Sequence, residues 1–304
     1  MPKWKTKNKK ELQAFYDEAN AALSEVRKKI VAPDRFGYKG AVSAWHADNR
    51  SLEALGEMSG ADTRVGKWHF FHEVTQELTA EGEFDEKGEK VGIWKYYFSN
   101  GAIKSIANYS TGLIEFFLQD GGADSRYYLK DGKTDGEVDI FYACGIVKER
   151  LRYKEGKREG AGGTFYADGG RESTYMFNGD VLTGLYQSYY PNGKIKASEN
   201  YLNGELDGEY VSYYAVGKVD RKGKYRNGKA VGDWLYYHDN GRLEKKGSFN
   251  NGTSIGEWRF YDRKAELDEI RNLNEKGEIE GEAKIFVKGS LVITILYKNQ
   301  MPIE

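Results

Sequence analysis

The chain has 304 residues, of which 31% are charged and 39% hydrophobic, and its formal net charge is −1. Because the net charge is close to zero, it does not indicate binding to nucleic acid or to an anionic membrane. No apolar run reaches transmembrane length and no apolar segment follows the basic first ten residues, so we expect a cytoplasmic protein for which membrane attachment is disfavoured. A single cysteine, Cys144, excludes an internal disulfide.

Residues 9–31 have apolar side chains at spacings of three and four. This spacing predicts an amphipathic α-helix that ends before Pro33. We expect the helix to cap the exposed edge of the first hairpin, and a partner-binding or dimerising helix is the alternative. Gly40 and Trp45 fit a degenerate first repeat. We therefore assign residues 1–61 to an N-terminal segment made of the helix and a capping or degenerate repeat.

From residue 62 onward, a glycine recurs about every 24 residues, which indicates a repeat protein. Counting each of these glycines as position 1, positions 3, 6 and 18 of the repeat are usually aromatic or large and apolar. Position 10 is usually a second glycine, often after Asn or Asp. The position-1 glycines are Gly66, Gly92, Gly112, Gly136, Gly160, Gly184, Gly208, Gly232, Gly256 and Gly281.

Asn-Gly and Asp-Gly pairs separate short runs rich in aromatic and β-branched residues. These pairs favour hairpins with type I′ turns, in which both central residues have positive φ. Because one hairpin is only marginally stable alone, we expect about ten hairpins over residues 62–304 to stack side by side. The predicted fold is mainly β, an elongated antiparallel β-hairpin repeat array or solenoid-like ribbon. The apolar run at residues 291–297 is expected to be a buried or closing final strand.

The repeat resembles a known family. Residues 184–193 and 232–241 are similar to the MORN-repeat variant of bacterial YwqK-type antitoxins, and the resemblance covers roughly residues 62–300. It implies an antitoxin or immunity protein that neutralises a cognate protein toxin by direct occlusion. MORN-type repeats also form structural scaffolds and membrane-associated adaptors, which is the alternative implied by the same resemblance. A carbohydrate-binding ribbon with exposed Trp and Tyr side chains is a third possibility.

Catalytic and metal-binding patterns are missing from the sequence. His69 and His72 have an odd separation, which places them on opposite faces of a regular strand. The run that begins at Gly160 fills repeat positions 1 to 4 and precedes no predicted helix, so it does not indicate a phosphate loop. Acidic residues at position 2 of neighbouring repeats are about 10 Å apart, beyond the separation of a retaining glycosidase pair. We expect no enzyme activity, no cofactor and no metal.

Partner contacts are expected among recurrent aromatic side chains and acidic clusters. Tyr and Trp give large, rigid contact areas, and acidic groups would steer a basic toxin. A further surface for self-association is the N-terminal helix or a sheet edge. The irregular stretch between Gly112 and Gly136 adds two acidic candidates. The predicted contact residues are Trp68, Trp94, Tyr97, Glu81, Glu83, Asp85, Asp120, Asp124, Tyr186, Tyr210, Trp234 and Trp258.

Overall fold

The computed structural model describes residues 40–45, 51–60, 62–298 and 300–303. The helix predicted over residues 9–31 lies outside them. The described residues form β-strands joined by turns, without any helix. The prediction of a mainly β, antiparallel hairpin array is therefore confirmed for this part of the chain. Its contacts divide the chain into two units, residues 1–111 with 119–121, and residues 112–118 with 122–304.

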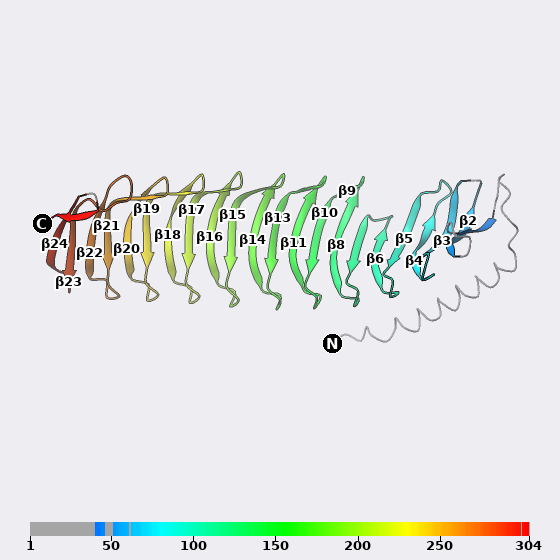
Figure 1. Cartoon of the computed structure of the whole chain (residues 1–304), viewed down its shortest axis with the longest axis horizontal. Coiled ribbons are helices and arrows are strands. Elements are labelled where there is room, and N and C mark those ends of the chain that lie inside the picture. Colours follow the sequence, from blue (N-terminus) through cyan, green and yellow to red (C-terminus); the bar gives the residue numbers. More distant parts are fainter. Residues whose placement is uncertain (1–39, 46–50, 61, 299, 304) are drawn as a thin grey trace. The chain divides into compact units, whose positions relative to one another are not determined.

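Unit 1 contains six strands, and each strand pairs antiparallel with the next along the chain (Figure 1). The strands are β1 (Gly40–Trp45), β2 (Leu52–Met58), β3 (Arg64–Phe71), β4 (Leu78–Phe84), β5 (Lys90–Tyr97) and β6 (Ile103–Asn108).

Unit 2 has an antiparallel pattern of the same kind, in which strands follow one another in chain order (Figure 1). Its strands are β7 (Leu113–Phe117), β8 (Ala123–Lys130), β9 (Lys133–Thr134), β10 (Gly136–Phe141), β11 (Val147–Lys154), β12 (Lys157–Arg158), β13 (Gly160–Phe165), β14 (Arg171–Asn178), β15 (Val181–Tyr189), β16 (Ile195–Leu202), β17 (Glu205–Tyr213), β18 (Val219–Arg226), β19 (Lys229–Tyr237), β20 (Leu243–Asn250), β21 (Thr253–Tyr261), β22 (Leu267–Leu273), β23 (Gly281–Val287), β24 (Ser290–Lys298) and β25 (Met301–Ile303).

The glycine at position 1 is the site of a β-bulge. Between β16 and β17, Glu199 pairs with Tyr210 and Tyr201 pairs with Leu206, so three residues around Gly208 face the single residue Asn200. All ten position-1 glycines have positive φ, from 62° to 116°. Residues with a Cβ rarely adopt this conformation, which explains why glycine recurs there.

Two kinds of turn alternate along the sheet. At position 10 only the glycine has positive φ, as at Gly193 (79°), whereas Asn192 does not. The amide of Gly193 donates to the carbonyl of Tyr190, and Tyr190 donates to Lys194, as in a type I turn with a glycine bulge. Type I′ turns occur instead between repeats, where Asn203 (53°) and Gly204 (84°) both have positive φ. The type I′ prediction is thus correct for the second turn and wrong for the first.

The two sides of the sheet differ in chemistry. Residues at positions 3 and 5 lie on one side, which we call the aromatic face, and those at positions 2 and 4 lie on the other, the charged face. On the aromatic face, four tryptophans each lie over a glycine of the preceding strand. The pairs are Trp68 with Gly56, Trp94 with Gly82, Trp234 with Gly223 and Trp258 with Gly247. A Cβ added to any of these glycines would lie 2.1–2.2 Å from the indole Cδ2. Only glycine allows so close an approach.

Position 7 ties consecutive repeats together along one row of turns. The Tyr190 hydroxyl donates to the carbonyl of Tyr213 at 2.8 Å, and the Tyr214 hydroxyl donates to that of Tyr237 at 2.7 Å. Tyr142 and Tyr166 make the equivalent bonds, 23 residues apart in each case. The row therefore fixes the register of one repeat on the next.

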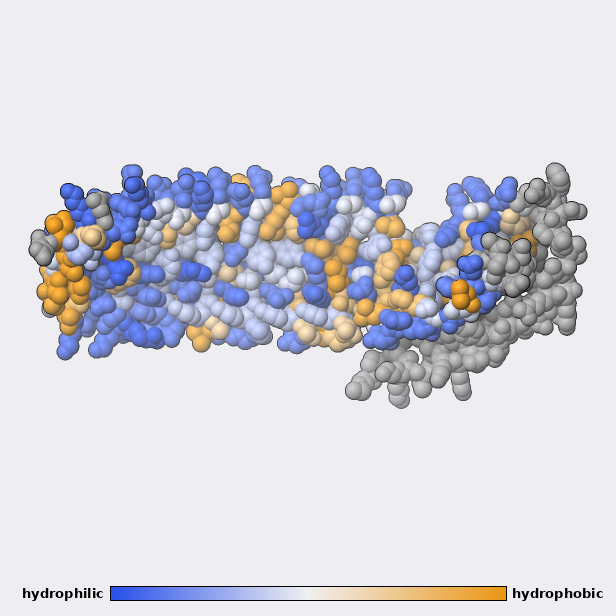
Figure 2. All heavy atoms as spheres, viewed as in Figure 1, coloured by the Kyte–Doolittle hydropathy of each residue, from blue (hydrophilic) through white to orange (hydrophobic). Residues whose placement is uncertain are grey.

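The apolar strand β24 is exposed, contrary to the expectation of a buried final strand. Leu291, Val292 and Ile293 are 53%, 57% and 47% exposed. Hydrophobic side chains gather at this strand in Figure 2. β25 pairs only with residues 296–298 of β24, so within the described residues it covers only part of the outer edge.

Candidate functional site: a tyrosine groove on the aromatic face

Three consecutive repeats carry a small hydroxyl residue at position 5. These residues are Thr164, Ser188 and Ser212. The other repeats have a large side chain there, such as Tyr96 or Tyr236. Because position 5 lies in the middle of the aromatic face, three small residues in succession leave this face unfilled across β13 to β17.

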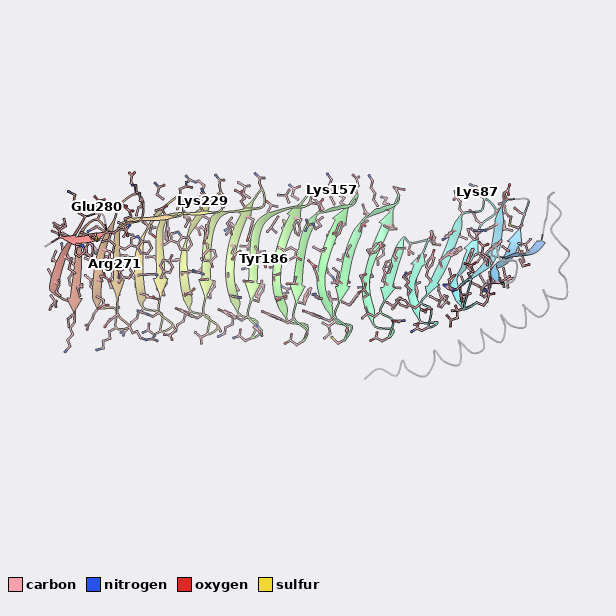
Figure 3. The ribbon with its side chains drawn as sticks, viewed as in Figure 1. Lys87, Lys157, Tyr186, Lys229, Arg271 and Glu280 are labelled. Atoms are coloured by element: carbon pink, nitrogen blue, oxygen red, sulfur yellow. The ribbon has the colours of Figure 1, made fainter. Side chains whose placement is uncertain are left out.

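Two adjoining cavities occupy that space, with volumes of about 530 Å³ and 550 Å³. Both are lined by Tyr186, Ser188 and Lys196, so they form one groove. Buried Ser173, Ala197 and Ser212 make its floor. We call this site the tyrosine groove. In Figure 3, Tyr186 lies over the middle of the strands, whereas Lys157 and Lys229 lie beside the turns at one edge.

Four tyrosines form one wall of the tyrosine groove. The rings of Tyr175 and Tyr186 stack with centroids 6.0 Å apart and planes 10° apart. Tyr186 contacts Tyr201 edge to face at 5.9 Å. Tyr210 follows in the next repeat and also lines the groove. These half-buried rings offer rigid contact area, and the hydroxyl of Tyr186 makes no hydrogen bond within the described residues.

Two carboxylates accept hydrogen bonds from the hydroxyls of these tyrosines. The Tyr175 hydroxyl donates to Glu149 at 2.7 Å, and the Tyr201 hydroxyl donates to Glu199 at 3.1 Å. Burial, followed by the charge of Glu199 and this hydrogen bond, raises the pKa of Tyr201 to about 12. Burial and the hydrogen bond to Glu149 likewise raise the pKa of Tyr175. Both tyrosines are therefore neutral donors at physiological pH, and both carboxylates keep a second oxygen for another partner.

The tyrosine groove carries more acidic than basic groups. Its acidic residues are Glu149, Glu172, Glu199 and Asp220, and its basic residues are Lys196 and Arg221, which leaves two negative charges in excess. Asp220 is engaged locally, because Ser212 donates to it at 2.8 Å and Arg221 lies 3.7 Å away. The excess charge favours a cationic partner.

Of the residues predicted as contacts, Tyr186 and Tyr210 lie in the tyrosine groove. The four tryptophans are instead 1–5% exposed, so their side chains stabilise the sheet and offer little surface to a partner. They are Trp68, Trp94, Trp234 and Trp258.

The structure brings Glu81 and Tyr97 together in unit 1. The Tyr97 hydroxyl donates to Glu81 at 2.7 Å, and the Lys95 ammonium lies 3.1 Å from the same oxygen. The imidazole of His69 is 3.8 Å from the other oxygen. Glu83 lies two residues along β4 with an exposed side chain. The charge of Glu81 is thus largely compensated by neighbouring groups of the sheet.

The remaining acidic candidates lie in or beside turns. The amides of Glu89 and Lys87 donate to Asp85, each at 2.9 Å, which lowers the pKa of that carboxyl. Asp85 therefore shapes its own turn. Asp120 is exposed and belongs to unit 1. Asp124 is exposed in unit 2 and accepts a hydrogen bond from Ser125 at 3.1 Å.

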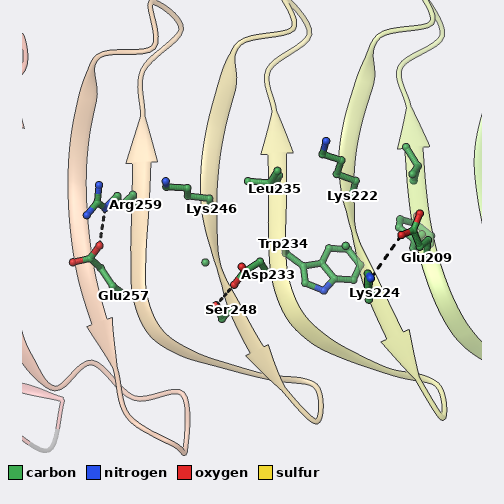
Figure 4. Close-up of a pocket in the computed structure, with 14 residues that line it drawn as sticks. Glu209, Lys222, Lys224, Asp233, Trp234, Leu235, Lys246, Ser248, Glu257 and Arg259 are labelled. Atoms are coloured by element: carbon green, nitrogen blue, oxygen red, sulfur yellow. Dashed lines mark hydrogen bonds and ion pairs between the residues drawn. The ribbon is translucent and has the colours of Figure 1, made fainter.

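A larger cavity of about 670 Å³ lies on the charged face over β17 to β21 (Figure 4). Most of its charges are paired with neighbours. Lys224 lies 3.7 Å from Glu209, Arg259 donates to Glu257 at 2.6 Å, and Ser248 donates to Asp233 at 2.6 Å. This pairing is typical of a solvated charged face, and it leaves fewer groups for a partner.

Among the described residues, no group of three or more His, Cys, Asp or Glu side chains could hold a metal ion. The same part of the chain has no helix that is long and apolar enough to span a membrane.

The position-5 residues were not among the contacts predicted from the sequence, although the sequence contained a signal for them. Comparison of the repeats gave weight to positions where residues recur. The site lies where the recurrent residue is replaced in consecutive copies, at Thr164, Ser188 and Ser212. A run of small residues at an otherwise large, core-facing position would have located the groove.

Comparison with known proteins identifies the repeat type. The family described as MORN repeat variant matches the chain at residues 90–110, 182–203 and 230–251. No curated protein matches it significantly. A solved structure of TcdB2-TccC3-Cdc42 is 13% identical over 86% of this chain and 16% of that chain, with a TM-score of 0.20. The Tc holotoxin pore of Photorhabdus luminescens is 12% identical over 81% and 15%, with a TM-score of 0.18. This chain thus spans about a sixth of those chains, and such likeness is too weak to indicate a shared function.

Proposed function

We propose that this protein is a non-catalytic binding module that neutralises a cognate protein toxin in the cytoplasm by direct occlusion. The tyrosine groove is its main contact surface. The observation that carries the proposal is the opening of a tyrosine-walled groove by three consecutive small residues at position 5. The antitoxin assignment comes from the resemblance to YwqK-type repeats, and the three MORN repeat variant matches support the repeat type on which it depends.

The chemistry of the groove suits a protein partner. Half-buried Tyr175, Tyr186 and Tyr210 give contact area at little cost in side-chain entropy, because their rings are already held by neighbours. The excess of carboxylates favours a basic segment. A toxin that acts on phosphate-containing substrates carries such a segment at its active site, so the groove would occupy the place of the substrate.

Co-expression tests the proposal directly. The full chain is expressed with each toxic product encoded beside its gene, and growth is measured. The wild-type chain should restore growth against one of them. Ser188→Tyr should abolish the rescue, because the new tyrosine fills the groove. Other repeats already have tyrosine at this position, as at Tyr96 and Tyr236.

Leu185→Tyr is the matched control, since Leu185 lies on the same strand, 50% exposed, on the charged face. It should rescue growth as well as the wild type at equal soluble level. Rescue by Ser188→Tyr would refute the groove as the contact surface. Failure of the wild-type chain against every neighbouring product would refute the antitoxin function.

A structural scaffold is the second candidate, favoured by the exposed apolar side chains of β24. A scaffold of this kind would self-associate through Leu291, Val292 and Ile293. Light scattering on the wild type and on Val292→Lys tests it, and equal monomer mass for both proteins at high concentration would contradict it.

A further inference from the structure

One wall of the tyrosine groove carries part of a regular row of charged residues. Between β13 and β14, Thr164 pairs with Ser173 and Phe165 pairs with Arg171, so Glu172 is the extra residue of a β-bulge. Position 13 holds the extra residue of this bulge in neighbouring repeats of unit 2 as well, and we call these charged residues the charge row. Its members are Asp124, Lys148, Glu172, Lys196, Asp220, Glu244 and Asp268.

The sign of the charge alternates along the first five members of the charge row, from Asp124 to Asp220. Its last three members, Asp220, Glu244 and Asp268, are all acidic. Paired strands are about 4.7–4.9 Å apart, and consecutive members lie two strand spacings apart, which is about 9.4–9.8 Å. Since the fold accepts three acidic residues in succession, folding does not require a lysine between acidic members.

Lys196 lies at the centre of the groove with a free ammonium group. It lines both cavities, and it is exposed. Within the described residues, neither Lys196 nor Glu172 makes a hydrogen bond or an ion pair. Asp220, the next member, instead accepts a hydrogen bond from Ser212 at 2.8 Å and lies 3.7 Å from Arg221. The groove thus offers a partner one free ammonium with a carboxylate on either side of it.

The place of this ammonium decides which segments fit the groove. A segment that is basic throughout would put one of its cations beside Lys196, and a like-charge contact of this kind is costly across an interface. A segment with an acidic side chain at this place, and basic side chains on either side, would meet Glu172, Lys196 and Asp220 with opposite charges. Interfaces often become specific through such a repulsive contact with the wrong partner.

We propose that Lys196 is a specificity-determining residue of the tyrosine groove. It selects a partner segment in which one acidic side chain lies between two basic ones, about 9.4–9.8 Å from each, and it rejects segments that are basic throughout. This inference rests on the proposed function, because it takes a protein segment as the occupant of the groove. It adds that the excess of carboxylates alone does not define the partner.

Two matched peptides test the selection. The mixed peptide is Lys-Gly-Gly-Glu-Gly-Gly-Lys, and the basic peptide has lysine in place of its glutamate. An extended chain spans about 3.3 Å per residue, so neighbouring charges of either peptide can lie about 10 Å apart. Each peptide carries a fluorescent label and is titrated with the full chain at low ionic strength, where charges are weakly screened. Anisotropy gives the two affinities and their ratio.

Lys196→Glu is the decisive variant. It should tighten binding of the basic peptide and weaken binding of the mixed peptide, so that the ratio of the two affinities changes at least about tenfold from wild type. Circular dichroism should show an unchanged fold, because three acidic members already follow one another in the charge row. An unchanged ratio, or binding of neither peptide, would overturn the inference.

Lys222→Glu is the matched control, because it makes the same change of charge at an exposed residue of the charged face. It should change the ratio less than about twofold, since its charge lies on the other side of the sheet. Lys196→Arg keeps the cation and should keep the wild-type ratio. An equal effect of Lys196→Glu and Lys222→Glu would show that net charge decides, and it would refute the role of Lys196.

Growth rescue separates this inference from the proposed function. Rescue that is lost in Ser188→Tyr, with an affinity ratio that Lys196→Glu leaves unchanged, would refute the inference and leave the proposed function standing. A ratio that Lys196→Glu changes as expected, without rescue by the wild-type chain from any neighbouring toxic product, would support the selection and refute the antitoxin function.

Discussion

Replacement of Gly223 by alanine should destabilise unit 2 through its contact with Trp234. The new Cβ would lie 2.2 Å from the indole Cδ2, far inside van der Waals contact, so the ring must leave its place. Trp234 is only 2% exposed and contacts Tyr225 and Phe249 edge to face. Overpacking costs about 1–3 kcal/mol and loss of a buried aromatic side chain about 3–5 kcal/mol, so we expect a loss of about 3 kcal/mol.

A second substitution should restore part of this loss. Where position 16 carries a side chain, as at Glu199, the strand that follows has Tyr210 in place of tryptophan. Trp234→Tyr should therefore make room for the alanine at 223. The indole N–H of Trp234 has no acceptor among the described residues, so the substitution forfeits packing but no hydrogen bond. The double variant should lose at least about 1 kcal/mol less than the sum of the single variants.

Urea unfolding followed by far-ultraviolet circular dichroism measures these losses on the full chain. Lys222→Ala is the control, because its side chain is exposed on the charged face beside Gly223, and it should change stability by less than about 0.5 kcal/mol. A loss of less than about 0.5 kcal/mol for Gly223→Ala, or full additivity in the double variant, would refute the reasoning.

Three further predictions concern polar groups. Asp139 is 1% exposed and accepts hydrogen bonds from Arg126 and Arg150; burial raises its pKa, but the two guanidinium groups outweigh this and lower it. Asp139→Asn should therefore lower the free energy of unfolding by about 2 kcal/mol in urea at pH 7. This difference from wild type should shrink below about pH 3.8, because the wild-type carboxyl is then protonated. Because the pKa of Tyr201 is raised, wild-type stability should fall between about pH 10 and 12, where only the unfolded state loses the proton. The melting temperature of Glu199→Gln should fall less than that of the wild type over this range. Tyr190→Phe removes the hydrogen bond to the Tyr213 carbonyl and should cost about 1 kcal/mol by the same urea assay; no change would mean that the position-7 row does not hold the register.

The architecture could be predicted because every repeat is subject to the same backbone constraint and therefore has the same residue type at the same position. Glycine at position 1 recurs because a bulge with positive φ excludes other residues, as the φ of 71° at Gly184 illustrates. The pairing of Gly223 with Trp234 could also have been predicted from the sequence, since a glycine at position 16 is followed by a tryptophan in the next strand. It was missed because positions were compared within a repeat and not across neighbouring strands.

The site was harder to predict because exposure depends on curvature and packing, which periodicity does not report. Trp234 and Tyr186 occupy the same position of the repeat, but only the first has a glycine beneath it and becomes buried. Tyr186 faces the bulkier Tyr175 and remains half-buried in a groove. The apolar run in β24 likewise looked like core from its hydrophobicity, although the described residues leave it exposed.

Tyrosine footprinting of the complex with a toxin identified by the co-expression assay tests the proposed contact surface most directly. Iodination is compared for the free protein and the complex, and modified residues are read by mass spectrometry. Tyr186 and Tyr210 should lose most of their reactivity in the complex, whereas Tyr128, which is 39% exposed outside the groove, should keep it. Unchanged reactivity of Tyr186 and Tyr210 in a stable complex would contradict the account.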